Sequence, residues 1–264
     1  MRRTWICTNK QSKRFGHYIG IDQDEKAISF CNDLFKKETN ISIFHKNYQE
    51  FDSILPKTPS PYLNKVLLDL GISSYQLDQA ERGFSFQKDE HLDLRMNKDT
   101  TLTASNILNS YDKESLSNVF FNYGELHQNK RLTEAILKTR KKIPIKTTFQ
   151  LCELIKSSYF FNHSRSKMIK TYSQVFQALR IEVNRELECL KTFLAKLTKH
   201  LQPNSIVAII SFHSLEDRIV KHFVKENKQF KPCHKGVIQA SENERLSNPR
   251  AKPAKLRLFK FSSY

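Results

Sequence analysis

The feature that most constrains the fold is an alternation of short apolar strands with a helix, in which each strand runs into polar residues. Segments 17–22 (HYIGID), 41–47 (ISIFHKN) and 65–71 (KVLLDLG) have the composition of strands. Segment 24–38 carries apolar residues on one helical face, and Asp24 is placed to cap it. This order is typical of an α/β sheet with parallel strands.

The alternation stops near residue 101, where several helices follow one another without a strand. They are predicted at 104–110, 112–122, 125–142 and 147–159, with Asp112 and Thr147 as caps. The sheet pattern then resumes with a helix at 174–200, a strand at 205–212, a helix at 215–227 and an edge strand at 255–261. We therefore expect an α/β domain in two parts, 1–100 and 173–264, interrupted by an all-helical insertion at 101–172.

Charge points to a polyanionic partner. The chain of 264 residues has 44 Lys and Arg against 27 Asp and Glu, a net charge of +17. Such an excess favours nucleic acid or a membrane surface, of which we favour nucleic acid, and a basic solvated surface is the alternative interpretation. No apolar run reaches the roughly 18 residues of a membrane span, so no membrane partner is expected.

The five cysteines are scattered and form no C-x-x-C pair, which argues against a disulfide framework and against a zinc site. We expect a reducing compartment and no metal. The N-terminal segment MRRTWICTNKQSKR is basic and has no apolar core of a signal peptide. The expected location is the cytoplasm, with the mitochondrial matrix as the alternative.

Two residues at strand ends are candidates for binding a nucleotide. An acid at the end of the second strand of a nucleotide-binding sheet usually accepts both hydroxyls of a ribose, and Asp22 suits that role. The competing interpretation is that Asp22 or Asp24 only caps the following helix. Tyr48 could lie against an adenine, or it could be part of the core.

Asp69 ends an apolar strand, where a carboxylate is costly to bury without a partner. An exocyclic amine of a base is such a partner, and an acceptor on its N–H would make the nitrogen a better nucleophile. The following loop offers Gln76 for hydrogen bonds and Phe84 and Phe86 for stacking on a base. Alternatively, the loop hydrogen-bonds to itself.

The segment SFHSLEDRIVKHF has a structural interpretation. Ser214 followed by Asp217 resembles a capping box ahead of an amphipathic helix. His213 is not explained by it.

Five motifs in order carry a resemblance to a known family. They are LLDLGISSYQLDQAERGFSFQKDEHLDLRMN, NYGELHQNKRLTEAI, FQALRIEVNREL, SFHSLEDRIVKHF and NPRAKPAKLRL. Together they resemble the RsmH (MraW) family of ribosomal small-subunit RNA methyltransferases, from about residue 18 to residue 258. The resemblance implies a Rossmann-like methyltransferase sheet with an inserted helical domain. It also implies methylation of N4 of a cytidine in the decoding region of the rRNA, with S-adenosylmethionine as methyl donor.

The resemblance also assigns roles to residues at matching positions. It implies that Asp22 holds the cofactor ribose, that Tyr48 lies by the adenine where the family usually has Phe, and that Gln76 contacts the cofactor. Asp69 matches a cofactor-binding and catalytic acid. The helical stretch matches the substrate domain, and there we predict phosphate contacts from Lys130, Lys138 and Lys141, which fall on roughly one helical face.

The sequence departs from the family at one place. The family begins with a strand and a Gly-Gly-His turn around the methionine end of the cofactor, and this sequence contains no Gly-Gly-His. We therefore expect the first strand and its turn to be missing. The main rival function is a catalytically impaired RNA-binding remnant. A nicotinamide-dependent dehydrogenase is disfavoured because no G-x-G-x-x-G is present.

Overall fold

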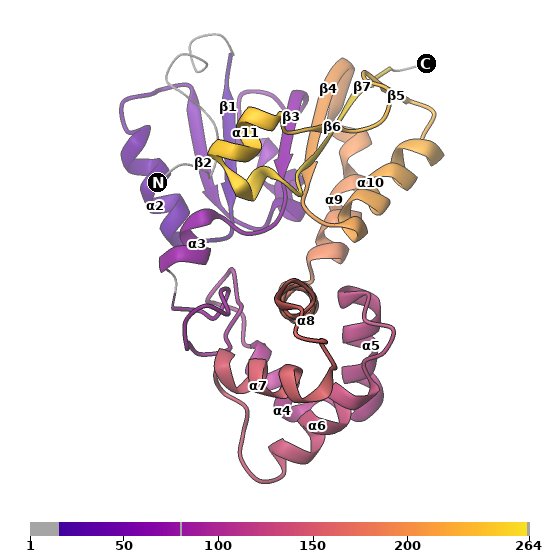
Figure 1. Cartoon of the computed structure of the whole chain (residues 1–264). Coiled ribbons are helices and arrows are strands. Elements are labelled where there is room, and N and C mark those ends of the chain that lie inside the picture. Colours follow the sequence, from indigo (N-terminus) through magenta and orange to yellow (C-terminus); the bar gives the residue numbers. More distant parts are fainter. Residues whose placement is uncertain (1–15, 80, 263–264) are drawn as a thin grey trace. The chain divides into compact units, whose positions relative to one another are not determined.

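The computed structural model describes residues 16–79 and 81–262 of the chain. These residues form two compact units. The helical unit is Ile72–Glu186, and the sheet unit combines the residues before Ile72 with those from Leu187 onward (Figure 1). Each unit has its own hydrophobic core.

The sheet unit begins with a β–α–β motif. β1 (Tyr18–Asp22) and β2 (Ile41–His45) pair in parallel and are joined by α2 (Glu25–Leu34). Asp24 is the N-cap of α2 and accepts a hydrogen bond from the Lys26 amide at 3.1 Å. The predicted strand–helix–strand order and the predicted cap are confirmed.

A second sheet of the same unit has the order β3-β4-β7-β5, with β6 also pairing with β7. Its strands are β3 (Leu63–Asp69), β4 (Leu201–Ser211), β5 (Phe230–Pro232), β6 (Ile238–Gln239) and β7 (Lys255–Phe261). β3 and β4 are parallel, whereas β7 runs antiparallel to β4. The prediction that 255–261 is an edge strand was wrong: β7 lies between β4 and β5, because its other edge is covered by the short strands β5 and β6.

Helices and short 3₁₀ turns complete the sheet unit. The helices are α9 (Glu186–Leu197, whose first residue ends the helical unit), α10 (Ser214–Glu226) and α11 (Glu242–Ser247). The 3₁₀ turns are η1 (Tyr48–Ser53), η2 (Leu55–Lys57), η3 (Thr198–His200) and η4 (Pro249–Ala251). Leu190 and Phe193 of α9 pack in one core with Leu68 of β3, and Ile19 and Ile21 of β1 lie against that core. The two sheets are therefore parts of one folded body.

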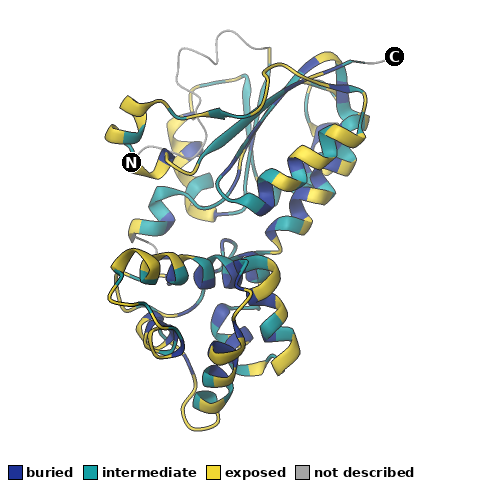
Figure 2. Ribbon diagram, turned by 45° about the vertical axis from the view of Figure 1, so that its right-hand side comes forward, coloured by how far each residue is buried: buried dark blue, intermediate teal, exposed yellow. Residues whose placement is uncertain are grey.

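The helical unit packs its helices around side chains that are almost completely buried (Figure 2). Its helices are α3 (Ser74–Gln79), α4 (Ala104–Ser110), α5 (Lys113–Gly124), α6 (Lys130–Arg140), α7 (Thr148–Ser158) and α8 (Arg165–Asn184). Asp112 and Thr147 cap α5 and α7 as predicted. Leu116, Phe120 and Leu132 are 0% exposed, which marks the centre of the core.

Two predicted helices have different bounds in the structure. The helix expected at 125–142 begins only at Lys130, because α5 ends in the left-handed residue Glu125 (φ 52°). Asn129 holds the connection between α5 and α6 by donating hydrogen bonds to the carbonyls of Ser117 and Leu126. The single helix expected at 174–200 is α8 and α9, separated at Arg185 (φ 50°).

The helical unit is also wider than the predicted insertion at 101–172. It starts at Ile72 because Phe84, Leu92 and Leu94 belong to its core, and it ends late because α8 runs on to Asn184. Within 16–79 and 81–262, no helix has both the length and the apolar character needed to cross a membrane.

Candidate active site

The structure gives the helix cap to Asp24 and leaves Asp22 as a candidate for binding a ribose. Asp24 is 4% exposed and takes the capping role at α2. Asp22 ends β1, is only half-buried, and accepts a hydrogen bond from the Asp24 amide at its Oδ1, 2.8 Å away. The helix cap therefore does not account for Asp22, whose carboxylate stands at the carboxyl end of a parallel strand, where α/β sheets bind nucleotides.

The end of β2 is tied to the end of β1 by polar side chains. Asn47 donates from Nδ2 to Gln23 Oε1 at 2.9 Å, and its Oδ1 accepts from the Gln49 amide to start η1. Tyr48, the next residue, is half-buried, and its ring meets Phe193 edge-on at 5.6 Å between centroids. Since Asp22 pairs with His45 in the register, Tyr48 and Asp22 belong to the same edge of the β1–β2 sheet.

Asp69 is the last residue of β3 and is exposed. It pairs with Ile210 in the parallel register with β4, and the Leu70 amide donates to the Ile210 carbonyl at 3.0 Å. Gly71 follows with φ +87°, a conformation that favours glycine and turns the chain out of the sheet. A fixed strand thus presents an accessible carboxylate next to the end of β4.

The turn after β4 is held by a buried acid that the sequence did not identify. Glu216 is 2% exposed, and its Oε2 accepts from the Phe212 amide at 2.8 Å. His213, not Ser214, is the N-cap of α10, and its Nε2 lies 3.2 Å from Glu216 Oε1. The predicted Ser214–Asp217 capping box was therefore wrong by one position. Histidine lies outside the usual set of capping residues, which is why the pattern hid it.

Asp217 instead fastens α10 to the sheet. Its carboxylate accepts from Arg257 of β7 at 2.7 and 3.1 Å, and Lys255 lies 3.7 Å away. Burial by itself raises the pKa of Asp217, but the hydrogen bonds and charge of Arg257 outweigh burial and hold that pKa below its ordinary value. The pair keeps α10, and with it the turn beside Asp69, in place.

Gln76 lies in α3, in the helical unit. It is 7% exposed, and its Oε1 accepts from the Ser73 amide at 2.9 Å while Ser73 Oγ accepts from the Gln76 amide. This part of the loop does hydrogen-bond to itself, as the alternative interpretation held.

The aromatic residues of the loop are structural as well. Phe84 is 7% exposed in the core of the helical unit, and Phe86 contacts the rings of Tyr172 and Phe176. The preceding Gly83 has φ +74°, and a Cβ there would lie 2.4 Å from a backbone oxygen. The hypothesis that Phe84 stacks on a base was therefore wrong.

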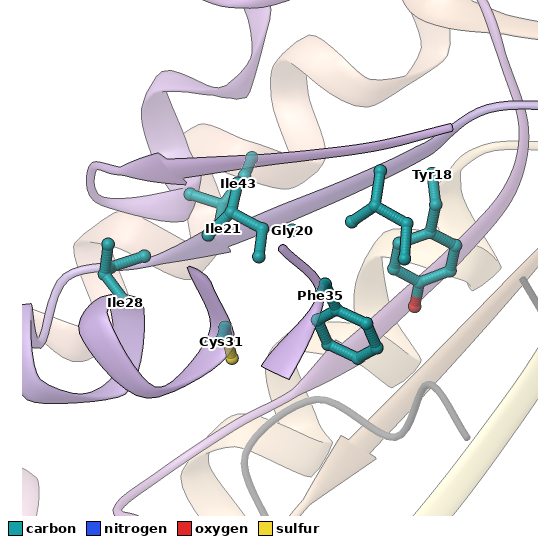
Figure 3. Close-up of a pocket in the computed structure, with 8 residues that line it drawn as sticks. Tyr18, Gly20, Ile21, Ile28, Cys31, Phe35 and Ile43 are labelled. Atoms are coloured by element: carbon teal, nitrogen blue, oxygen red, sulfur yellow. The ribbon is translucent and has the colours of Figure 1, made fainter. Parts of the chain in front are cut away.

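One hollow of the sheet unit lies beside the β1–β2 pair and α2 (Figure 3). It is lined by Tyr18, Gly20, Ile21, Ile28, Cys31, Phe35, Ile41 and Ile43. None of the predicted site residues is among them, and no lining side chain is an acid or a cation. The hollow therefore lacks groups that would recognise a ribose or a charged cofactor.

The predicted RNA-binding lysines are all exposed. Lys130 and Lys138 lie at the two ends of α6, and Lys141 follows its last turn. Glu134 lies between Lys130 and Lys138 and pairs with Lys113 at 3.1 Å. This acid lowers the positive potential near Lys130 more than near Lys141.

Parallel strand pairs that end on carboxylates, together with a second, helical unit, define an α/β protein. Residues 8–262 match the model of the MraW methylase family, and the chain belongs to this family of methyltransferases with a Rossmann-like fold.

The sequence of this chain is similar to those of curated relatives over most of their length. The chain is 43% identical over 243 residues to "Ribosomal RNA small subunit methyltransferase H" of Hydrogenobaculum sp. (strain Y04AAS1), covering 92% of this chain and 80% of that protein. The proteins of the same name from Fervidobacterium nodosum and Clostridium botulinum (strain Loch Maree) are 41% and 37% identical, covering 92% and 94% of this chain and 81% and 86% of theirs.

Proposed function

We propose that this chain methylates N4 of a cytidine in the decoding region of small-subunit rRNA, with S-adenosylmethionine as the methyl donor. Membership of the methylase family and the names of the relatives support an rRNA substrate. The observation that carries the proposal is the exposed carboxylate of Asp69 at the end of β3, in the same unit as Asp22 and Tyr48.

These side chains fit the groups of the proposed cofactor. The Asp22 carboxylate can accept hydrogen bonds from both ribose hydroxyls, and the Tyr48 ring offers an edge or face to the adenine. When bound, the cofactor supplies an electrophilic methyl group. Gln76 is the further proposed contact from the helical unit. No metal is required by this donor set.

The catalytic role of Asp69 follows from the weakness of the nucleophile. The lone pair of an exocyclic amine is delocalised into the base, so the nitrogen must become more tetrahedral as it attacks the methyl group. The Asp69 carboxylate accepts one N–H and stabilises the positive charge that develops on nitrogen. A contact from the loop after β3 or a water molecule then takes the proton.

The decisive variants are Asp69→Ala and Asp69→Asn, assayed with radiolabelled S-adenosylmethionine on unmodified small-subunit rRNA. Asp69→Ala should abolish transfer, and Asp69→Asn should still bind S-adenosylhomocysteine with little turnover. Asp33→Ala removes an exposed acid of α2 in the same unit and is the matched control. A rate above about a tenth of the parent, a loss under roughly 1.4 kcal/mol, would show that Asp69 does not hold the amine.

The alternative function is an RNA-binding remnant that transfers no methyl group. The observation that favours it is the lack of Gly-Gly-His in the sequence. Calorimetry with S-adenosylhomocysteine separates the two functions: binding to the parent chain, weakened by Asp22→Asn, supports the enzyme. Retained RNA affinity without any cofactor binding supports the remnant.

We also propose that Lys130, Lys138 and Lys141 contact phosphates of the rRNA. The triple alanine variant should lower the dependence of RNA affinity on salt by about one unit of slope per lost contact. Because Glu134 lies four residues from both Lys130 and Lys138, restoring Lys141 should recover most. Affinity for S-adenosylhomocysteine should not change, and an unaltered salt slope would leave these lysines as a solvated helix face.

A further inference from the structure

The connection between α7 and α8 displays the most exposed large apolar side chain among the residues that the structure describes. Phe160 is 88% exposed, although its neighbours Tyr159 and Phe161 both pack against the core of the helical unit. Burial raises the pKa of Tyr159 to about 12, in keeping with an enclosed hydroxyl. Phe160 is thus held outward between two inward-facing aromatic rings, which also contact each other.

The backbone around Phe160 is fixed by local structure. Tyr159 ends α7 with its amide bonded to the Ile155 carbonyl, and the Ser164 amide donates to the Phe161 carbonyl at 2.8 Å. Asn162 and His163 are consecutive left-handed residues, with φ of 46° and 59°. Such conformations cost roughly 1 kcal/mol or more each, so the turn that exposes Phe160 is maintained by its surroundings.

Cations follow this ring along the sequence, and acids do not. Arg165, Lys167 and Lys170 are exposed in the first two turns of α8. The sequence has no Asp or Glu from residue 154 to residue 181. No ion pair joins these three cations to any of the residues in 16–79 and 81–262. Ile169, 41% exposed, adds apolar surface beside them.

We propose that this α7–α8 patch (Phe160, Arg165, Lys167 and Lys170) binds a single-stranded segment of the RNA substrate. Phe160 stacks on one base, and the cations bind the flanking phosphates. Base stacking on an exposed aromatic ring combined with cations along the backbone is the usual chemistry of single-strand recognition. The inference rests on the proposed rRNA substrate and adds a contact apart from the cluster on α6.

Charge complementarity selects RNA over other occupants. A second copy of this chain, with a net charge of +17, would bring further positive charge to a patch that has no acid to balance it. A polyanion gains from the same three cations, and an apolar ring among them suits a nucleobase.

Stacking and charge can be measured separately. Fluorescence anisotropy would follow a labelled RNA of about 12 nucleotides with mixed sequence, between about 50 and 200 mM salt. Phe160→Ala should weaken binding by roughly fivefold or more without changing the salt slope. The double variant Lys167→Gln/Lys170→Gln should lower the salt slope by about 1.4, since a single-stranded contact contributes about 0.7.

Matched controls come from the same unit. Phe149→Ala removes a Phe that is 48% exposed but whose amide binds the Asp89 carboxylate. Lys113→Gln/Lys156→Gln removes two cations that are already paired with acids. Both control variants should bind the RNA like the parent. Equal losses of RNA affinity in the control and test variants would refute the proposal that the α7–α8 patch binds RNA.

A spectroscopic signal tests stacking directly. Trp5 is the single tryptophan of the chain, so the variant Trp5→Phe/Phe160→Trp places the fluorophore at position 160 alone. RNA should quench its emission, whereas polyphosphate, a polyanion without bases, should not. Equal quenching by RNA and by polyphosphate would refute stacking of position 160 on a base.

The outcomes also separate this inference from the proposed function. Methyl transfer and RNA affinity that persist unchanged in Phe160→Ala would overturn the patch and leave the function standing. If the parent chain binds no RNA at all, both the patch and the proposed function are refuted. Self-association that disappears in Phe160→Ala, measured by sedimentation without RNA, would assign the patch to a second copy and refute the RNA contact.

Discussion

The helical unit and the sheet unit bury their regular structure to different degrees. In the helical unit, α5, α6 and α7 each place side chains at 0% exposure in one core. In the sheet unit, β4 alternates buried and half-buried residues from Ser205 onward, but β1 has only Gly20 buried and β2 has no buried residue. Leu67 in β3 is 37% exposed.

The less buried part of the sheet unit is the part that carries the candidate site. Asp22, Tyr48 and Asp69 all belong to or follow β1, β2 and β3, whereas β4 has the most buried residues of the strands in this unit. Ligand-binding elements are commonly drawn from the less stable regions of a fold. We therefore expect the helical unit to act as a rigid scaffold and the β1–β3 region to respond most to ligand and substitution.

Substitutions at apolar side chains give the largest test of this contrast. Phe120→Ala should cost about 3–5 kcal/mol of unfolding free energy, because Phe120 is 0% exposed and leaves a cavity. Leu67→Ala in β3 should cost under about 1 kcal/mol, since that side chain already meets solvent. Urea denaturation followed by circular dichroism measures both. Similar losses would remove the proposed difference between the units.

Two glycines with positive φ sharpen the same contrast. Gly83 in the helical unit has φ +74°, and an added Cβ would lie 2.4 Å from the His91 carbonyl oxygen. Gly236 in the sheet unit has φ +85° with no atom within 4 Å of that position. Gly83→Ala should cost about 2–3 kcal/mol of unfolding free energy, and Gly236→Ala about 1 kcal/mol for conformation alone. Thermal unfolding of the two variants provides the comparison, and a loss at Gly236 equal to that at Gly83 would contradict it.

Local signals predicted much of this fold. The β1–α2–β2 order, the caps Asp24, Asp112 and Thr147 and most helices of the helical unit follow from periodicity and capping chemistry. The position of β7 inside the sheet could not be predicted in this way, because strand pairing between distant segments is not encoded in local alternation. The break at Arg185 was also hidden, since an arginine in the left-handed region has no composition signal.

The candidate site was predictable where a residue's place in a strand decides its role. Asp69 and Asp22 at strand ends could be named as candidates from the sequence, and the structure confirms that the helix cap is Asp24 and not Asp22. Phe84 could not be distinguished from a stacking residue, because an aromatic side chain in a loop suits both a core and a base. Glu216 was missed because its partners are backbone amides that no sequence pattern identifies.

Acid should weaken an ion pair in each unit. The pKa of Asp217 in the sheet unit lies below its ordinary value of 3.8 because Arg257 outweighs burial, and Arg95 does the same for Asp93 in the helical unit. With a lowered folded pKa, each carboxylate stabilises the protein above pH 3.8, and the stabilisation is lost as pH falls through the folded value.

The two pairs differ in what they connect. Asp217→Asn should cost about 1 kcal/mol of unfolding free energy at pH 7 and flatten the pH dependence of the sheet unit, because the pair joins α10 to β7. Asp93→Asn removes a contact between residues two apart and should cost less. Urea midpoints from pH 7 to about 3 test this, and an unchanged acid limb in Asp217→Asn would refute the assignment.

The smallest expected effect concerns an exposed ion pair of the helical unit. Lys113 and Glu134 lie 3.1 Å apart, but their side chains are 59% and 49% exposed, so water and salt screen their attraction. A double-mutant cycle with Lys113→Ala and Glu134→Ala should give a coupling energy below about 0.5 kcal/mol. The same cycle on Arg257 and Asp217, which are 16% and 15% exposed, should give a larger value. A coupling for Lys113–Glu134 as large as that for Arg257–Asp217 would show that surface charge stabilises the helical unit. In that case its rigidity would not come from the apolar core alone, and the contrast with the sheet unit would have to be redrawn.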